Sequence, residues 1–368
     1  ARQEWGGNPC CAPDVHVALD AQFGHRQSAR VLLDPLIAPH QFFLSTCELD
    51  NARSHVNACR SRRSEQAAVA PQLEDDVLDC CEQSFKAADQ DRQRARAKAY
   101  TVHGIMAIVC QHNVPLFVAN LVDPGEWHYY AVALIWKVSQ HLPGMATLGI
   151  LYDIACQLDR AMRQVRLMGL SRGHAADTLL PHGYMPELRH QVTWGTSVLH
   201  AYGHQWACQL VYHPRKCPGF GFSDGENCER LWSETSDLIP LERLMGPHRR
   251  EYAIEAHLTH LALQHQLGLG TWLTRQLCKV QQRRVVGITN LAQQDVSHDT
   301  LRTWWKDQQE SQCSLRSCTP LPQCPCFRIS SCSKQGLTGS LTMQHSNSRT
   351  WLRNMHAWCS SWKPLQLI

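Results

Sequence analysis

Residues 104–122 read GIMAIVCQHNVPLFVANLV, and this stretch decides which fold the chain can adopt. It holds two apolar segments of strand length, residues 104–110 and 115–122. Only a short polar turn around QHN separates them, too short for a crossover connection. The stretch therefore predicts an antiparallel β-hairpin.

Further strands and helices are expected on both sides of this hairpin. VHVAL at residues 15–19 has the alternating side chains of a strand, and Asp20 follows it. TLGILY at residues 147–152 has the pattern of a buried strand, and Asp153 follows it. Residues 192–199 have the pattern of a fifth strand. Helical spacing follows at residues 126–141, 154–168, 200–212, 226–242 and 249–267.

The order of these elements narrows the fold class. Periodicity alone indicates a mixed α/β domain. A three-stranded antiparallel meander followed by alternating helices and parallel strands is the order of a ribonuclease-H-like fold. We therefore predict an α/β fold with a ribonuclease-H-like core, a mixed five-stranded sheet flanked by helices, and helical insertions.

Composition shifts along the chain predict its domain organisation. Residues 1–285 are expected to form the core, with an insertion at residues 50–100 that is polar at first and then a charged helix. Residues 286–313 are expected to extend it as a helix. Residues 314–368 place cysteines among Ser, Pro and Gln without apolar periodicity, which predicts a poorly ordered tail.

Composition also limits the class of protein. Hydrophobic residues make up 43% of the 368 residues and charged residues 18%, which excludes global disorder. The net charge of +4 permits nucleic-acid binding without demanding it. No signal segment is visible and no run approaches the roughly 20 apolar residues of a membrane span, so we expect an intracellular protein that is neither secreted nor in a membrane. In a reducing compartment, the 18 cysteines suggest metal binding or burial rather than disulfides.

Three acidic residues stand out by their positions. Asp20 and Asp153 each follow an expected strand, and Glu229 lies at the start of an apolar-periodic helix. Carboxylates held at a sheet edge can share two ions of Mg²⁺ or Mn²⁺ about 3.5–4 Å apart, the arrangement of metal-assisted phosphoryl transfer. The alternative for each residue alone is a helix cap or a turn former.

A second group of residues has ligand chemistry. HAYGHQWAC places His200, His204 and Cys208 four residues apart, but eight helical residues rise about 12 Å, too far for the outer two to share an ion. His204 and Cys208 can pair with Cys156 or Cys110 from neighbouring strands in a structural zinc site. The alternative, which the sequence favours, is a packed helix whose histidines are hydrogen-bonded in the core.

The motifs together resemble the fungal KDZ (Kyakuja, Dileera and Zisupton) transposases. The resemblance runs in chain order through DVHVALDAQFGHR (14–26), CEQSFKAADQDR (81–92), the segment 104–135, LGILYDIACQLDR (148–160), LHAYGHQWACQLVYHPRK (199–216) and GFGFSDGENCERLWS (219–233). It departs from the usual family text at residues 101–104, 110–113 and 20–23.

The resemblance implies a ribonuclease-H-like core with a DDE-type site. It identifies Asp20 as the first acid, Asp153 as the second and Glu229 as the third, with Glu226 and Asp224 as alternatives for the third. Two ions of Mg²⁺ or Mn²⁺ would be the cofactors.

The same resemblance implies transposon-end DNA as the partner, a homo-oligomer in a synaptic complex and a nuclear location. Arg230 and Arg249 are the candidates for phosphate contacts, and a solvated surface role is the alternative for both. Two rival functions are a decayed or domesticated transposase that binds DNA or protein without catalysis, and a zinc-dependent structural module.

Overall fold

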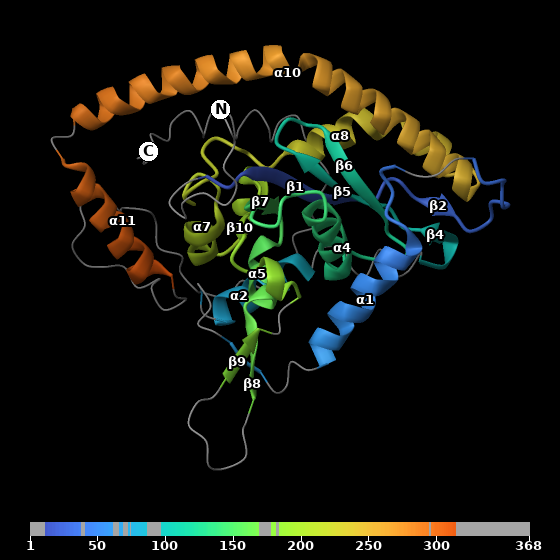
Figure 1. Cartoon of the computed structure of the whole chain (residues 1–368), viewed down its shortest axis with the longest axis horizontal. Coiled ribbons are helices and arrows are strands. Elements are labelled where there is room, and N and C mark those ends of the chain that lie inside the picture. The colour runs from blue at the N-terminus through green and yellow to red at the C-terminus, as the bar shows by residue number, and fades with distance from the viewer. Residues whose placement is uncertain are drawn as a thin grey trace, which may run out of the picture. The chain divides into compact units, whose positions relative to one another are not determined.

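Five strands form the central sheet of the computed structural model, in the order β10-β7-β1-β5-β6 (Figure 1). β1 pairs antiparallel with β5 and parallel with β7, β5 pairs antiparallel with β6, and β10 lies parallel to β7. The predicted mixed five-stranded sheet and its hairpin are confirmed. The strands are β1 (Val15–Gln22), β5 (Ile105–Cys110), β6 (Pro115–Asn120), β7 (Leu148–Tyr152) and β10 (Val192–Gly195).

The structure describes residues 12–37, 41–61, 66–68, 73, 75–86, 97–168, 178–181, 184–293 and 296–313. The tail expected at 314–368 lies outside these residues. The boundary expected at residue 285 falls inside a single helix, α10 (Pro247–Ala292), and the division into core and extension stays a prediction.

Alternation along the strands divides the core between the two faces of the sheet. Val17 and Leu19 of β1 pack with α1 (Thr46–Ser61), α4 (His128–Ser139) and α5 (Ala155–Met162) in one apolar cluster. Ala18 packs in a second cluster with α8 (Asn227–Thr235) and the first turns of α10. Figure 1 shows the sheet between these two layers of helices. Because side chains of a strand alternate between faces, Asp20 shares the α8 side with Ala18.

Smaller elements complete the described part of the chain. β2 and β4 form a two-stranded sheet, and β3, β8 and β9 a three-stranded one. The remaining bounds are β2 (Gln27–Ser28), α2 (Asp75–Lys86), β3 (Gln66–Ala68), η2 (Ala97–Ala99), β4 (Tyr100–Val102), β8 (Gln164–Met168), β9 (Thr178–Pro181), η3 (Pro186–Leu188), α6 (Val198–Ala201), α7 (Trp206–Tyr212), η4 (Ser236–Leu238), α9 (Ile239–Glu242) and α11 (His298–Gln312).

Two expected helices are shorter than their spacing suggested. The helix expected at 154–168 ends at Met162, and residues 164–168 form β8, because pairing with β3 and β9 overrides the local helical pattern. The helix expected at 200–212 is broken into α6 and α7. The break covers residues 202–205, where the amide of Gly203 donates to the carbonyl of His200 in a tight turn and Gln205 is extended.

Other boundaries also differ from expectation. β1 continues past Asp20 to Gln22, because its antiparallel partner β5 extends the pairing to Ile105. The helix expected at 226–242 is divided into α8, η4 and α9, whereas the one expected at 249–267 runs on to Ala292.

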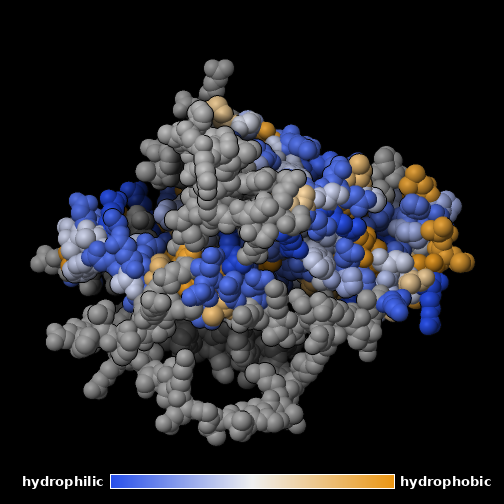
Figure 2. All heavy atoms as spheres, turned by 90° about the horizontal axis from the view of Figure 1, so that it is seen from below, coloured by the Kyte–Doolittle hydropathy of each residue, from blue (hydrophilic) through white to orange (hydrophobic). Residues whose placement is uncertain are grey.

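No described helix combines the length and the apolar character needed to cross a bilayer. On the face of the molecule shown in Figure 2, the coloured residues are mostly hydrophilic, with small apolar clusters among them.

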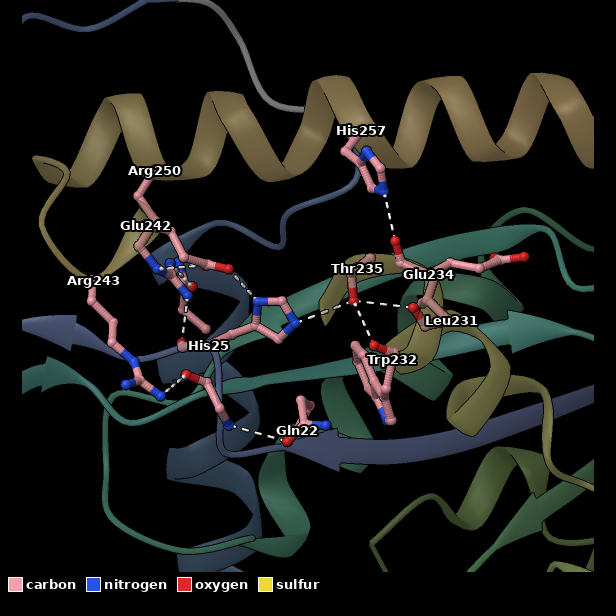
Figure 3. Close-up of polar contacts among 12 residues, drawn as sticks. Gln22, His25, Leu231, Trp232, Glu234, Thr235, Glu242, Arg243, Arg250 and His257 are labelled. Atoms are coloured by element: carbon pink, nitrogen blue, oxygen red, sulfur yellow. Dashed lines mark hydrogen bonds and ion pairs between the residues drawn. The ribbon is translucent and has the colours of Figure 1, made fainter. Parts of the chain in front are cut away.

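A buried ionic network fixes α9 and α10 against the turn after β1 (Figure 3). His25 Nδ1 and Arg250 Nε both contact the carboxylate of Glu242, Arg250 at 3.4 Å, and all three side chains are at most 1% exposed. Arg250 Nη2 also donates to the carbonyl of His25 at 2.8 Å, and His25 Nε2 lies 3.2 Å from Thr235 Oγ1 in α8. The network therefore joins β1 to three successive helices.

Replacing Glu242 with alanine should lower the free energy of unfolding by about 3–5 kcal/mol, because the buried guanidinium of Arg250 then lacks the carboxylate that balances its charge. Glu310→Ala is the matched control: its contact with Lys306 on α11 is 66–76% exposed, and its loss should change stability by less than about 1 kcal/mol. Urea denaturation measures both. Equal effects of the two substitutions would contradict a stabilising role of the network.

Candidate functional site

Asp20 and Asp153 lie next to each other at one edge of the central sheet. β1 and β7 are parallel, and Leu19 is paired with Tyr152, so the residue after each of these stands at the same level. Neighbouring strands are about 4.8 Å apart. Both aspartates lie on the sheet face covered by α8, and Trp232 of α8 donates from Nε1 to Asp20 Oδ2 at 2.7 Å. The sheet therefore brings together two carboxylates that are far apart in sequence.

The first turn of α8 brings further carboxylates to this edge. Glu226 precedes α8, and Glu229 lies exposed in its first turn. Cys228 is buried between them, and its thiol contacts the carbonyls of Ala18 at 3.4 Å and Ala107 at 3.7 Å, which seats the start of the helix on the sheet.

Gly225 allows the loop before α8 to approach β7. Its φ is +77°, a conformation that favours glycine, and a Cβ there would lie 3.0 Å from both Leu151 Cβ and Ser197 Cα. Next to it, Glu226 Oε1 accepts from the amide of Leu199 at 2.9 Å. Glu226 Oε2 is buried and has no hydrogen-bond partner among the described residues.

Glu126 is a carboxylate of this site that the sequence analysis missed. It lies in the loop before α4, and Tyr152 donates its hydroxyl to Glu126 Oε1 at 2.7 Å. The sequence could have indicated Glu126 by its position in DPGEW, which lies directly before an apolar helix and within a segment that resembles the family.

Electrostatic repulsion shows that these carboxylates form one group. Burial and then the charge of Glu126 raise the pKa of Asp20 to about 8, and Glu229 adds to this. Burial, followed by Asp20, Glu226 and Glu229, raises the pKa of Asp153 well above its ordinary value. Burial and Asp153 raise the pKa of Glu126 to about 7. Each group resists ionisation because its neighbours are negative and water is scarce.

Asp224, the other alternative for the third acid, has its charge balanced locally. Burial raises its pKa, but Arg230 outweighs burial and holds the pKa below the ordinary value. The guanidinium bonds both carboxylate oxygens at 3.1 Å, and its Nε donates to Asn113 Oδ1 at 2.8 Å. Arg230 therefore makes several contacts within the chain. Arg249 differs, since its side chain is 68% exposed and lies 3.9 Å from Asp34.

His200 belongs to the acidic site rather than to the cysteines. Its Nδ1 lies 3.1 Å from Asp153 Oδ1 and 2.6 Å from Ser197 Oγ. Burial lowers its pKa although Glu229 acts in the opposite direction. Because the expected helix is broken after α6, His200 and His204 project from different elements.

A cluster of cysteines surrounds His204 on the other side of Asp153. The Nδ1 atom of His204 lies 3.3 Å from Cys208 Sγ and 3.7 Å from Cys156 Sγ, so the structure brings these three residues together. Cys81 of α2, which the sequence analysis did not include, forms with His204 and Cys208 a group that could hold a metal ion. Hydrogen bonds from Cys156 and then Cys208 hold the pKa of Cys81 below its ordinary value.

Cys110 is the alternative ligand that the structure does not favour. Its sulfur lies 3.7 Å from Nδ1 of His112, which follows it in the hairpin turn. Cys81 lies in CEQSFKAADQDR, one of the segments that resemble the family. Its distance in sequence from Cys156 and His204, 75 and 123 residues, does not indicate that they meet in the fold.

Comparison with known families identifies the family of this chain. A family model for the Kyakuja-Dileera-Zisupton transposases matches residues 13–261, more than half of the chain. The matched region contains the whole acidic group and the cysteine cluster. The chain therefore belongs to the Kyakuja-Dileera-Zisupton transposase family. No curated protein and no solved structure matches it.

The raised pKa of Asp20 predicts a pH-dependent cost of the acidic group. At a pH between 3.8, the ordinary pKa of the carboxyl, and about 8, the carboxyl of Asp20 is ionised in the unfolded chain but stays protonated in the folded chain. The free energy of unfolding therefore falls as the pH rises through this range. Asp20→Asn removes the cost. Its melting temperature should exceed that of the wild type by several degrees at pH 8 and differ little at pH 4.

Differential scanning calorimetry in divalent-free buffer tests this dependence. Asp237→Asn, at an exposed position of η4, is the control and should give the same difference from the wild type at every pH. If the melting temperature of Asp20→Asn exceeded that of the wild type equally at every pH, repulsion between the ionised carboxylates would not be the cause.

Proposed function

We propose that this family member is a DDE-type transposase that cleaves phosphodiester bonds at transposon ends and transfers the freed strand. The observation that supports the proposal best is the electrostatic coupling of Asp20, Asp153 and Glu229, which are brought to one edge of the sheet from three separate elements. A fold gains no stability from placing like charges next to one another, so a function is the better explanation for the group.

The sheet supports a ribonuclease-H-like core as the scaffold. Taken in chain order, the first three strands of the sheet are antiparallel neighbours, and the fourth and fifth lie parallel on the other side of the first. This is the meander followed by parallel strands that the order of elements predicted. It places the ends of the first and fourth strands side by side, where both aspartates lie.

The donor set of the site fits Mg²⁺ or Mn²⁺. Its groups are carboxylates, which hard divalent cations prefer, and a buried oxygen of Glu226 accepts no hydrogen bond from the part of the chain that the structure describes. Asp20, Asp153 and Glu229 would hold the ions. When bound, the ions supply Lewis acidity that lowers the pKa of a nucleophilic water or hydroxyl and stabilises the leaving oxygen.

The protein groups around the ions would each have a distinct task. Trp232 donates to one oxygen of Asp20, and His200 contacts one oxygen of Asp153, so both carboxylates are held in fixed orientations. Glu126, with a pKa of about 7, can hold a proton beside Asp153 at neutral pH. Glu229 is our choice for the third acid, and Glu226 is the alternative because its free oxygen is buried at the same edge.

The substrate follows from the family and from this chemistry. DNA at the transposon ends would be the partner, within a synaptic homo-oligomer in the nucleus. Arg249 is exposed and can contact phosphates. Arg230 would do so only after giving up contacts with Asp224, so we assign it first to holding the loop before α8.

The proposal predicts Mn²⁺-dependent nicking of a plasmid that carries the ends of the encoding element. Asp20→Asn and Asp153→Asn keep the size of each side chain but remove a ligand charge, and each should lower the nicking rate by at least about 100-fold. The exposed Asp237→Asn serves again as the control and should cleave like the wild type. Wild-type protein that binds the ends without nicking them would favour the decayed or domesticated transposase instead.

The third acid is decided by a pair of substitutions in the same assay. Glu229→Gln should abolish nicking and Glu226→Gln should leave most of it, because we assign the metal contact to Glu229. The reverse result would move the assignment to Glu226 and leave the mechanism intact.

A further inference from the structure

Four potential ligands converge at a closed position behind the acidic site. Cys81, Cys156 and Cys208 are 0% exposed and His204 is 5% exposed. They come from α2, from α5, from the turn after α6 and from α7. All three cysteines are free thiols. Convergence of three thiols and one imidazole from four places in the chain calls for an explanation beyond apolar packing.

The distances between the donor atoms agree with a shared ion. In a tetrahedral zinc site with bonds of about 2.3 Å to sulfur and 2.0–2.1 Å to nitrogen, sulfur and nitrogen lie about 3.5 Å apart. His204 Nδ1 lies 3.3 Å from Cys208 Sγ and 3.7 Å from Cys156 Sγ, on either side of that value. The ligand atoms of Cys81, His204 and Cys208 all lie within 4.8 Å of one another.

The contacts around these residues orient them as ligands. His204 Nε2 lies 2.8 Å from the backbone carbonyl of Asp153, so Nε2 carries the proton and donates it. The lone pair of Nδ1 then faces the sulfurs. This arrangement, with one ring nitrogen bonded to a carbonyl and the other directed at the ion, is usual for metal-bound histidine. The amide of Gln205 donates to Cys81 Sγ at 3.5 Å, which stabilises negative charge on sulfur.

We infer that Cys81, Cys156, His204 and Cys208 bind one structural zinc ion. Three thiolates and one imidazole in a closed, buried site form a Cys₃His set, which suits Zn²⁺ and leaves no open position for catalysis. This site is separate from the acidic group, and the inference does not depend on the proposed nuclease activity.

The zinc ion would connect the inserted helix α2 to the catalytic strand. Asp153 directly follows β7, Cys156 lies three residues later, and His204 donates to the carbonyl of Asp153 itself. Outside the cluster, α2 and α5 are joined by the bond from Gln157 to the carbonyl of Leu78 and by the ion pair of Arg160 with Asp79. The ion would therefore fix the position of Asp153 from behind.

Metal analysis of the full chain tests the inference. Wild-type protein purified under reducing conditions with zinc present should contain one equivalent more than Cys81→Ser, Cys156→Ser or Cys208→Ser, whatever other zinc the chain binds. Cys217→Ser is the matched control: the Cys217 thiol follows α7 in the chain and donates to the carbonyl of Val211 at 2.7 Å, and this variant should keep the wild-type zinc content.

Two further measurements separate ligand loss from misfolding. Cys208→His replaces one ligand by another and should retain the zinc that Cys208→Ser loses. Cobalt bound to the wild type should show sulfur-to-cobalt charge transfer, which should fall by about one third in Cys208→His because one of three thiolates is gone. Equal zinc in the wild type and all serine variants, or a disulfide among these cysteines in the purified chain, would overturn the inference.

Discussion

The site depends on the parallel pairing of β1 with β7. Because Leu19 is paired with Tyr152, the next residue of each strand is an aspartate at the same level and on the same face. A shift of one residue in this register would turn one aspartate toward the opposite face, into the cluster that α4 and α5 cover. The apolar residues that alternate along β1 prevent this shift, so the same pattern that builds the core also aligns the carboxylates.

This alignment has a cost that the surrounding structure offsets. Half-buried carboxylates repel one another, and α8 must still be held close to them. The helix is held by the thiol of Cys228, the indole of Trp232 and the bonds of Asn227 and Arg230 to Asn113 in the hairpin turn. At its far end, Thr235 contacts the network of His25, Glu242 and Arg250. Favourable interactions outside the acidic group therefore keep it assembled.

Local pattern was sufficient to predict the sheet, but it could not supply non-local contacts. The hairpin and the strands before Asp20 and Asp153 follow from apolar segments of strand length, and the acidic edge follows from their parallel order. The strand β8 depends on partners distant in sequence, and a local turn at Gly203 interrupts the other expected helix, so helical spacing was misleading at both places. Glu126 and Cys81 were missed because each joins its group only through the packing of a loop or an inserted helix. The catalytic roles of the acids stay predictions.

The raised pKa values of Asp20 and Glu126 change how the site would meet a phosphate backbone. Acids that are partly protonated near neutral pH carry less negative charge than the number of carboxyl groups implies, which would weaken their repulsion of a polyanion. Divalent cations that enter must then displace those protons. Binding of divalent cations at this site would therefore be coupled to the release of protons and would depend on pH.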